Sequence, residues 1–172
     1  ALAIDFLGKY SRFQNTLEFY ESVLSNEKML GSIEAQAKAK LERAVRVAKE
    51  SLKVKEFPNG FILCTANLQK SFKPGDFPGK GMLAGAVHDH VGAQMKGPVV
   101  TIGYSGRLFS IRANAEARTR NFDANSMINQ IKRELINSIE SGGGHDVAAS
   151  LYVNDGFENI VLEEIVRHIS SL

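Results

Sequence analysis

The sequence predicts a mixed α/β fold, in which a small sheet is flanked by helices, with an N-terminal helical extension. Apolar residues in the first third recur at spacings of three and four, which is typical of amphipathic helices. Further along, short apolar runs bounded by Gly and Pro alternate with helical patterns. We therefore expect a helical linker or extension at 1–56 and an α/β domain at 57–172.

The extension is expected to contain two helices. The apolar stripe of the first consists of Phe13, Leu17, Tyr20 and Leu24. We expect Gly31 to end this helix and Ser32 to cap a second one that reaches Leu52. The outer face of the second helix is basic, which favours a solvated surface; the alternative is a helix that lies along nucleic acid or links two domains. Its basic residues are Lys38, Lys40, Arg43, Arg46, Lys49 and Lys53.

The second region reads as alternating strands and helices. The expected strands are 61–66, 99–104, 108–113 and 151–153, and the expected helices are 82–95, 123–138 and 157–169. Ser105-Gly106 suits a hairpin turn between the two middle strands. A Gly- and Pro-rich loop covers 70–81, and a break in regular structure is expected at 141–145.

Composition and charge limit the class of protein. The chain has 172 residues, of which 44% are hydrophobic and 23% charged, so it is long enough to bury one core. No apolar run approaches the roughly 20 residues of a transmembrane helix, and no signal peptide is recognisable, so we expect no membrane partner. The single cysteine, Cys64, excludes an internal disulfide and lies in an apolar run, which favours a buried thiol and a cytoplasmic protein.

The net charge of +2 does not by itself indicate a nucleic-acid-binding protein, but its distribution is uneven. Residues 56–120 hold 8 basic and 4 acidic side chains, whereas residues 121–172 hold 3 and 8. The basic middle suits a polyanion, and the acidic tail suits solvent or a protein partner.

The segment Gly142-Gly143-Gly144-His145 is the most distinctive motif. Three consecutive glycines lose much backbone entropy on folding, which a protein tolerates where the backbone has unusual angles or a ligand approaches closely. We expect a loop whose amides bind an anion, with His145 as a further donor and Ala148-Ala149 allowing close packing. A flexible connection between a helix and a strand is the alternative.

Ser110 and Arg112 form a second candidate site. Residues two apart on a strand point to the same side, so a hydroxyl and a guanidinium are presented together. This pair suits phosphate, because arginine offers two parallel N–H donors and serine one more. An ordinary polar strand face is the alternative. Three further arginines would widen a basic patch: Arg107, Arg118 and Arg120.

No catalytic or metal centre is apparent in the sequence. His88 and His90 lie two apart on a predicted helix and do not share a face, so we expect no metal site and no cofactor in this chain. Lys80-Gly81 offers helix-terminal amides to an anion, which alone is a weak indication. There is no Trp, and aromatic residues for base stacking are scarce. The candidates are Phe72, Phe77 and Phe109, of which Phe109 is favoured as a core residue.

The glycine-histidine segment followed by Ala148-Ala149 resembles the signature of the accessory domain of RecJ-like DHH phosphoesterases. The resemblance covers about residues 60–170. Three further segments follow one another in the order typical of the family: Gly85-Ala86-Val87, Gly97-Pro98-Val99-Val100 and Ser110-x-Arg112. Ser150 stands where the family usually has Gly. The resemblance implies a two-domain, manganese-dependent phosphoesterase, whose catalytic DHH domain is missing here.

The resemblance also assigns roles to residues. Arg112 and His145 are implied as phosphate contacts, with backbone from Gly142 to Gly144 and a weaker contact from Ser110. The implied function is the substrate-binding domain of a single-strand exonuclease or oligonucleotide phosphodiesterase in DNA replication and repair, which is not catalytic alone. Two alternatives remain open. One is a non-catalytic scaffold similar to the archaeal RecJ-like factors of the GINS–helicase complex, and the other is a domain for a small phosphorylated ligand such as nanoRNA or a cyclic dinucleotide. The chain begins without Met, which favours a fragment or a trimmed form of a longer protein.

Overall fold

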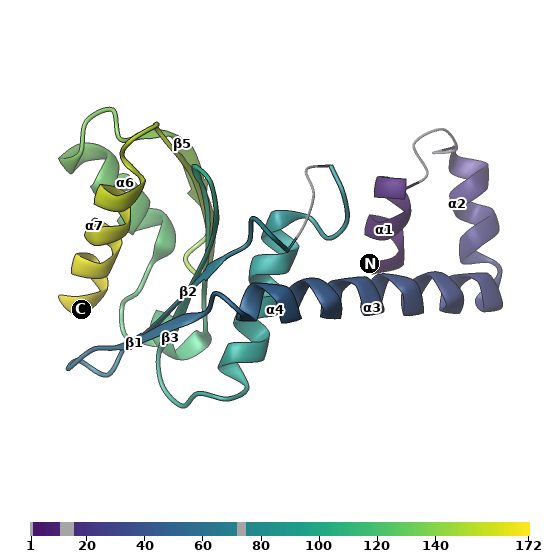
Figure 1. The fold of residues 1–172 in the computed structure, drawn as a ribbon, viewed down its shortest axis with the longest axis horizontal. Coiled ribbons are helices and arrows are strands. Elements are labelled where there is room, and N and C mark those ends of the chain that lie inside the picture. Colours follow the sequence, from purple (N-terminus) through teal and green to yellow (C-terminus); the bar gives the residue numbers. More distant parts are fainter. Residues whose placement is uncertain (1, 11–15, 72–74) are drawn as a thin grey trace.

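The computed structural model describes residues 2–10, 16–71 and 75–172, and its mixed α/β architecture confirms the predicted fold class. The helices described are α1 (Leu2–Tyr10), α2 (Leu17–Leu24), α3 (Glu27–Lys49), α4 (Lys80–Gly92), α5 (Ala115–Thr119), α6 (Ala124–Glu134) and α7 (Glu158–Ser170). The strands are β1 (Lys53–Glu56), β2 (Ile62–Asn67), β3 (Val99–Ser105), β4 (Leu108–Ala113), β5 (Ile139–Gly144) and β6 (Ala148–Val153). Figure 1 shows α6 and α7 on one side of the sheet and α4 with α3 on the other.

The strands form one sheet in the order β1-β2-β3-β4-β6-β5. Strands β2 and β3 are parallel, and α4 lies between them in the sequence, as a parallel pair requires a crossover connection. The other neighbouring strands are antiparallel. The hairpin between β3 and β4 turns at Gly106, which has a φ of +54°, as the sequence predicts for Ser105-Gly106.

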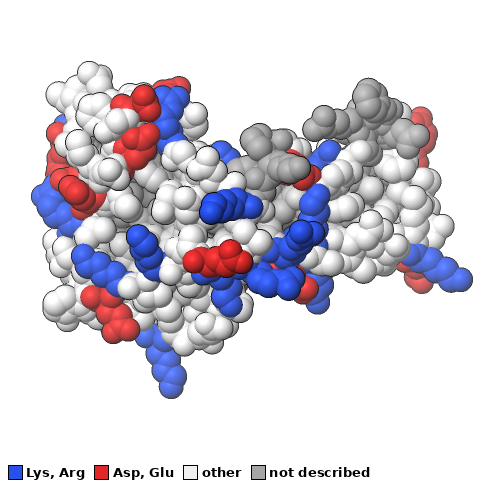
Figure 2. Space-filling model, viewed as in Figure 1, with Lys and Arg blue, Asp and Glu red and all other residues white. Residues whose placement is uncertain are grey.

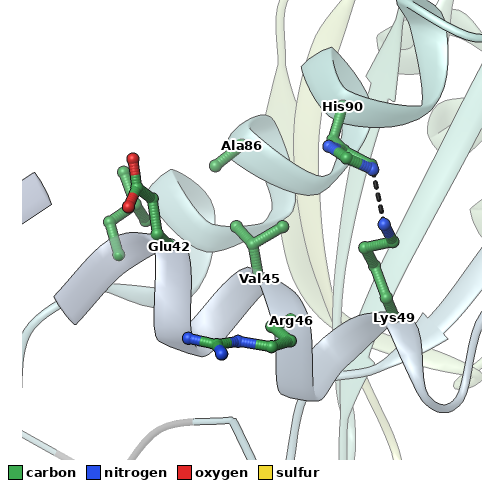
Figure 3. Close-up of a pocket in the computed structure, with 7 residues that line it drawn as sticks. Glu42, Val45, Arg46, Lys49, Ala86 and His90 are labelled. Atoms are coloured by element: carbon green, nitrogen blue, oxygen red, sulfur yellow. Dashed lines mark hydrogen bonds between the residues drawn. The ribbon is translucent and has the colours of Figure 1, made fainter. Parts of the chain in front are cut away.

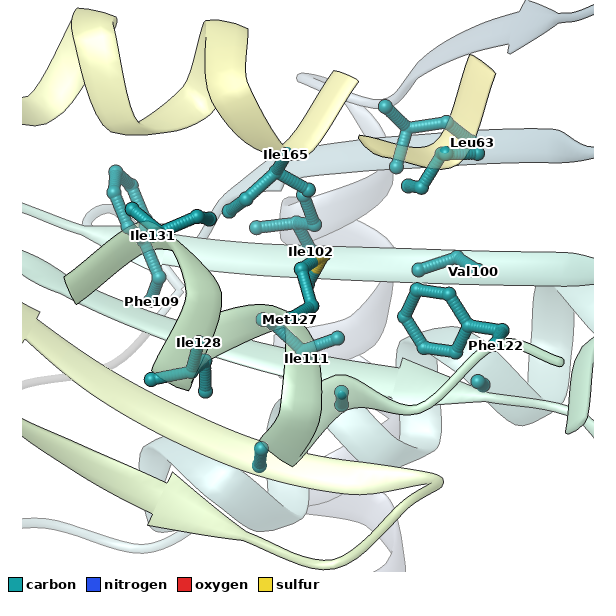
Figure 4. Packing of buried hydrophobic residues seen from close by; sticks show 14 of the residues in the cluster. Leu63, Val100, Ile102, Phe109, Ile111, Phe122, Met127, Ile128, Ile131 and Ile165 are labelled. Carbon is teal, nitrogen blue, oxygen red and sulfur yellow. The ribbon is translucent and has the colours of Figure 1, made fainter. Parts of the chain in front are cut away.

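The main hydrophobic core lies between the sheet and the helices α6 and α7 (Figure 4). Strand residues of odd number on β4 point into it, as Phe109 and Ile111 do. From the helices, Met127, Ile128 and Ile165 pack against them. Burying side chains of this size stabilises the fold by roughly 1.5–3 kcal/mol each.

The opposite face of the sheet is covered only in part. A second apolar cluster joins β2 and β3 to α4 and the C-terminal half of α3. Strand β6 lies beyond this cover. Its residues Ala148, Ser150 and Tyr152 are partly exposed, whereas Ala149 and Leu151, which point to the main core, are buried. We call the partly exposed side of β4 and β6 the open face.

The N-terminal helices extend away from the sheet (Figure 1). Helices α1 and α2 pack on the N-terminal part of α3 through a small separate cluster of Ala3, Leu7, Val23 and Ile33. The predicted helix break at Gly31 and Ser32 is wrong. Helix α3 is continuous, and Asn26 caps it by accepting a hydrogen bond from the Met29 N–H at 3.0 Å. Phe13, placed in the predicted first stripe, lies outside the described residues.

Several boundaries also differ from the sequence prediction. Residues Lys53–Glu56, inside the segment expected to be helical, form edge strand β1, whose side chains are all exposed and so carry no apolar alternation. Helix α6 ends at Glu134 rather than 138, and Asn137 has a φ of +63° in the turn that follows. The break expected at 141–145 is instead largely strand β5.

Candidate phosphate-binding site

Arg112 lies on β4 beside the first turn of α4. Its Nη2 donates a hydrogen bond to the carbonyl oxygen of Gly81 at 3.0 Å, and its Nη1 donates to the carbonyl oxygen of Ile111 at 2.8 Å. A methyl group at Gly81 would lie 3.3 Å from Nη2, and one at Gly85 would lie 3.8 Å from Nε. Glycine at position 81 therefore leaves room for the guanidinium between helix and sheet, whereas the distance at Gly85 is an ordinary van der Waals contact.

The positive charge of Arg112 is incompletely compensated. Within residues 2–10, 16–71 and 75–172, no carboxylate forms an ion pair with it. Burial lowers the pKa of Arg112, and the negative charge of Asp89 opposes this shift. Because the ordinary pKa of arginine lies far above neutrality, the side chain stays a cation at neutral pH. A partly buried cation of this kind is unfavourable on its own, so an anion bound there would be stabilising.

The N-terminus of α4 adds positive potential at the same place. The helix has 13 residues, its N-cap Gly79 makes no side-chain cap hydrogen bond, and its first turn holds no acidic residue. Backbone N–H groups at such a terminus attract anions. The sequence offered Lys80-Gly81 as a weak anion site, and the structure places this turn against Arg112.

Ser110 points to the same side of β4 as Arg112, but it is only 2% exposed. Its hydroxyl oxygen lies 3.4 Å from that of Ser150 on β6. The structure therefore favours Arg112 over Ser110 as a direct contact for an external ligand. Phosphate binding by Ser110 stays a prediction.

The three glycines of the glycine-histidine segment belong to edge strand β5, so their interpretation as a loop is wrong. A methyl group at Gly142 would lie 2.8 Å from Leu151 Cβ, and one at Gly144 would overlap the Ala148 carbonyl oxygen. The glycines thus let β5 approach β6 closely. Two side chains of α6 bond to the strand, because Lys132 donates to the Gly142 carbonyl oxygen at 2.9 Å and Asn125 Oδ1 accepts from the Gly144 N–H at 3.2 Å.

Strand β6 connects the glycine-histidine segment to Arg112. Arg112 is the register partner of Ala148, whose carbonyl oxygen accepts a hydrogen bond from the His145 N–H at 2.8 Å. His145 is exposed. The backbone of the two predicted phosphate contacts therefore lies on neighbouring parts of the fold, while their binding of phosphate stays a prediction.

The surrounding arginines have other partners. Arg118 forms a 2.6 Å ion pair with Asp146, which directly follows His145. Arg120 pairs with Glu116 at 3.5 Å, and Arg107 pairs with Glu140 at 3.6 Å. Their charges are locally compensated, unlike that of Arg112.

The histidines near α4 have structural partners. The Nδ1 of buried His88 lies 2.8 Å from the hydroxyl of Thr101, and His90 Nε2 lies 2.6 Å from Lys49 Nζ. Within the described ranges, no group of three or more His, Cys, Asp or Glu side chains is arranged to hold a metal ion. The described residues therefore do not fit the two-metal centre that the family resemblance implies for a catalytic domain, and we assign no reaction step to a metal.

Lys and Arg side chains gather over α3 in Figure 2. Lys40, Arg43 and Lys70 line a hollow of about 640 Å³ between α1, α3 and the segment that leads to α4. Lys40 bonds to Asp76 there at 3.1 Å. Pro78, which precedes the N-cap of α4, also lines the hollow, so the hollow reaches the start of that helix.

A different groove of about 390 Å³ separates α3 from α4 (Figure 3). Its apolar lining comes from Leu41, Val45 and Ala86. The hydrogen-bonded side chains of Lys49 and His90 lie together at one end. Glu42 and Arg46 also line the groove, so its polar groups carry charges of both signs. An apolar floor with a polar rim suits an amphipathic segment of another protein.

The sequence analysis missed Tyr152. Its aromatic candidate Phe77 is excluded, whereas the core position favoured for Phe109 is confirmed. Phe77 and Phe109 are 1% and 2% exposed, so they are core residues, and Phe72 lies outside the described residues. Tyr152 lies on the open face, and the Arg107 guanidinium carbon is 4.6 Å from its ring centroid. The sequence analysis expected a strand only over 151–153, so the alternation that places Tyr152 on the same face as Ser150 was not apparent.

None of the helices described here is long and apolar enough to cross a membrane. No family model matches the chain. It is 27% identical over 184 residues to the uncharacterized protein MJ1198 of Methanocaldococcus jannaschii, and the match covers all of this chain and 24% of that protein.

Solved structures show the same fold. A DHH domain from a protein described as a member of a family of ribosomal proteins superposes with a TM-score of 0.83 and 23% identity, over 99% of this chain and 41% of that one. RecJ from Thermus thermophilus, in complex with Mg²⁺, gives a TM-score of 0.59 at 10% identity, over 100% and 25% of the two chains. CDC45 from Entamoeba histolytica gives 0.56 at 14% identity, over 98% and 36%. The chain thus spans less than half the length of these relatives, and its fold is that of the RecJ-like DHH accessory domain, as the sequence resemblance predicts.

Proposed function

We propose that this chain is the substrate-binding accessory domain of a RecJ-like DHH phosphoesterase and holds the phosphates of a single-stranded nucleic acid or short oligonucleotide. The observation that carries the proposal is the position of Arg112 at the first turn of α4, whose N-cap is the glycine Gly79. Its guanidinium is partly buried and has no ion-pair partner among the described residues. A phosphate there would receive charge-assisted hydrogen bonds from arginine and backbone N–H groups. His145 is proposed as a second contact, because its backbone is bonded to the register partner of Arg112.

The proposal includes no hydrolysis by this chain. Manganese-dependent cleavage is proposed only for a separate DHH catalytic domain, as the family resemblance implies. The basic hollow lined by Lys40, Arg43 and Lys70 would continue the path of the polyanion away from Arg112.

The test is a fluorescence anisotropy titration with labelled single-stranded DNA and RNA, each at about 50 and 200 mM salt. We expect Arg112→Ala to weaken binding by about tenfold or more, since hydrogen bonds to charged groups contribute roughly 1.5–3 kcal/mol. It should also reduce the magnitude of the salt slope by about 1. His145→Ala should weaken binding as well, and unlabelled mononucleotides should compete poorly.

Arg167→Ala is the matched control, because Arg167 is an exposed arginine on α7 that pairs with Glu134 and Glu164. It should leave affinity unchanged. Failure of the unmodified chain to bind either polymer at low salt would refute the proposal, and so would equal losses in the Arg112 and Arg167 variants.

A second candidate function is that of a non-catalytic scaffold in a replication complex, and the groove between α3 and α4 favours it (Figure 3). The partner would place an amphipathic, acidic segment on Val45 and Ala86, near the amine of Lys49. A purified archaeal GINS complex is the partner to test, by calorimetry with the unmodified chain and with Val45→Asp. Binding lost only in the variant, with oligonucleotide affinity retained, would support the scaffold; no heat of binding would exclude this partner.

A further inference from the structure

The open face holds an aromatic side chain that the phosphate site does not use. Tyr152 and Arg112 point to the same side of the sheet, because both follow the alternation shared by paired strands β4 and β6. The register pairs Leu108 with Tyr152 and Arg112 with Ala148. Nothing in the main core depends on Tyr152, since its buried neighbours along β6 point the other way.

The position of the tyrosine ring is fixed by Arg107. The guanidinium carbon lies 4.6 Å from the ring centroid, and Glu140 on β5 holds the same guanidinium at 3.6 Å. Hydrogen bonding to Tyr152 raises the pKa of Arg107, which therefore remains charged. A ring held by a cation loses little conformational freedom when a further flat group stacks on it.

The spacing along the sheet suits an oligonucleotide. Tyr152 pairs with Leu108, four residues along β4 from Arg112, which corresponds to about 14 Å at the usual rise of a strand. A single nucleotide does not span this distance, whereas a short extended strand does. Between the two sites the register places only the pair Ser110 and Ser150, of which Ser150 is partly exposed, so no large side chain of β4 or β6 separates Tyr152 from Arg112.

We propose that Tyr152, held in place by Arg107, stacks on a nucleobase of the single strand whose phosphate is bound at Arg112. The inference rests on the proposed phosphate site and adds to it a base subsite on the open face. Stacking on an aromatic ring accepts every base, so this subsite would add affinity for a strand without sequence preference. It also defines the substrate as an oligonucleotide longer than one nucleotide.

The chain offers a direct probe of this contact. Because the sequence contains no Trp, Tyr152→Trp introduces a single indole fluorophore on the open face. The probe ligand is a single-stranded oligonucleotide, compared with the same oligonucleotide in which every residue is abasic. We expect the first to quench the indole emission and the abasic polymer to bind without quenching.

Affinity provides the second measurement. Tyr152→Phe keeps the ring and should bind like the unmodified chain, whereas Tyr152→Leu keeps bulk without the ring and should bind about tenfold more weakly. Against the abasic polymer, all three proteins should have the same affinity. A loss in Tyr152→Leu that is equal for both polymers would show a structural effect and overturn the inference, as would an unquenched indole in the saturated complex.

These outcomes separate the subsite from the phosphate site. Salt-sensitive binding that is lost in Arg112→Ala but unaffected by Tyr152→Leu would support phosphate binding and refute stacking. No binding by the unmodified chain would refute both.

Discussion

Replacing Gly144 by Ala should destabilise the protein strongly, although this residue is exposed on an edge strand. Gly144 has a φ of +154°, a backbone conformation that side-chain-bearing residues rarely adopt, and that strain costs about 1–3 kcal/mol. The added methyl group would also overlap the Ala148 carbonyl oxygen and lie 2.6 Å from Ala149 Cα. Both are backbone atoms of β6, so the clash can be relieved only by moving the strands apart.

We expect a loss of about 3 kcal/mol, near the upper end of that strain and within the usual range for a single substitution. In a chain of this length each kcal/mol corresponds to about 2–4 °C in Tm, so the melting temperature should fall by about 6–12 °C. Thermal unfolding followed by circular dichroism measures this change. The temperature scan should be repeated at two rates to check reversibility.

Gly143→Ala is the matched control within the same triplet. Gly143 does not have a positive φ, and a methyl group there would meet only Asn125 Oδ1, at an ordinary 3.5 Å. Its stability should change by less than about 0.5 kcal/mol. If Gly144→Ala melts like the unmodified chain, close strand approach does not explain the glycines, and an exclusive role in ligand binding becomes the better explanation.

Two further predictions concern buried titratable groups. Burial lowers the pKa of His88 below its ordinary value of about 6.5, so the unfolded chain binds the proton more readily than the folded one. The stability that His88 contributes above pH 6.5 should therefore be lost as the pH falls. The Tm of His88→Gln should decrease less between pH 7 and pH 5 than the Tm of the unmodified chain. A pH dependence of Tm equal in both proteins would contradict this. Burial raises the pKa of the Cys64 thiol to about 11, so little reactive thiolate is present in the native protein at pH 8. Iodoacetamide at this pH should therefore label the unfolded chain and leave the native chain unlabelled. Rapid labelling of the native chain would contradict this prediction, because it would show that the thiol is accessible.

Apolar periodicity predicted the elements that bury one face. Helix α6 carries an apolar stripe at helical spacing, and its inward residues fill the core between sheet and helices. Strand β3 was predicted from a continuous apolar run, and it is buried on both faces over Val99–Gly103. Strand β1 was missed for the converse reason: an edge strand with every side chain exposed has no buried face to produce the pattern. Gly31 was taken as a helix end, but the packing of Ile33 and Ala37 keeps α3 continuous through it.

The candidate site was predicted in part. The alternation of a strand placed Ser110 and Arg112 on one side, and the structure agrees. Local sequence did not show that Ser110 would be buried beside Ser150, or that α4 would bring Gly81 to Arg112, since both depend on contacts between distant segments. Tyr152 was missed because the expected strand was too short to reveal that it shares a face with Ser150 and Ala148.

The glycine-histidine segment helps to position the candidate site, although its glycines form a strand rather than a loop. Its glycines let β5 pair closely with β6, and that pairing fixes which residues of β6 face the core and which face outwards. A one-residue shift of β6 would bury Tyr152 and expose Leu151, so the register determines whether the open face exists. The triplet therefore supports the proposed site indirectly, by holding the strand that lies between Arg112 and the exposed edge of the sheet. On this reasoning, Gly144→Ala should weaken oligonucleotide binding only to the extent that it disturbs folding, whereas Arg112→Ala should weaken it in a fully folded protein.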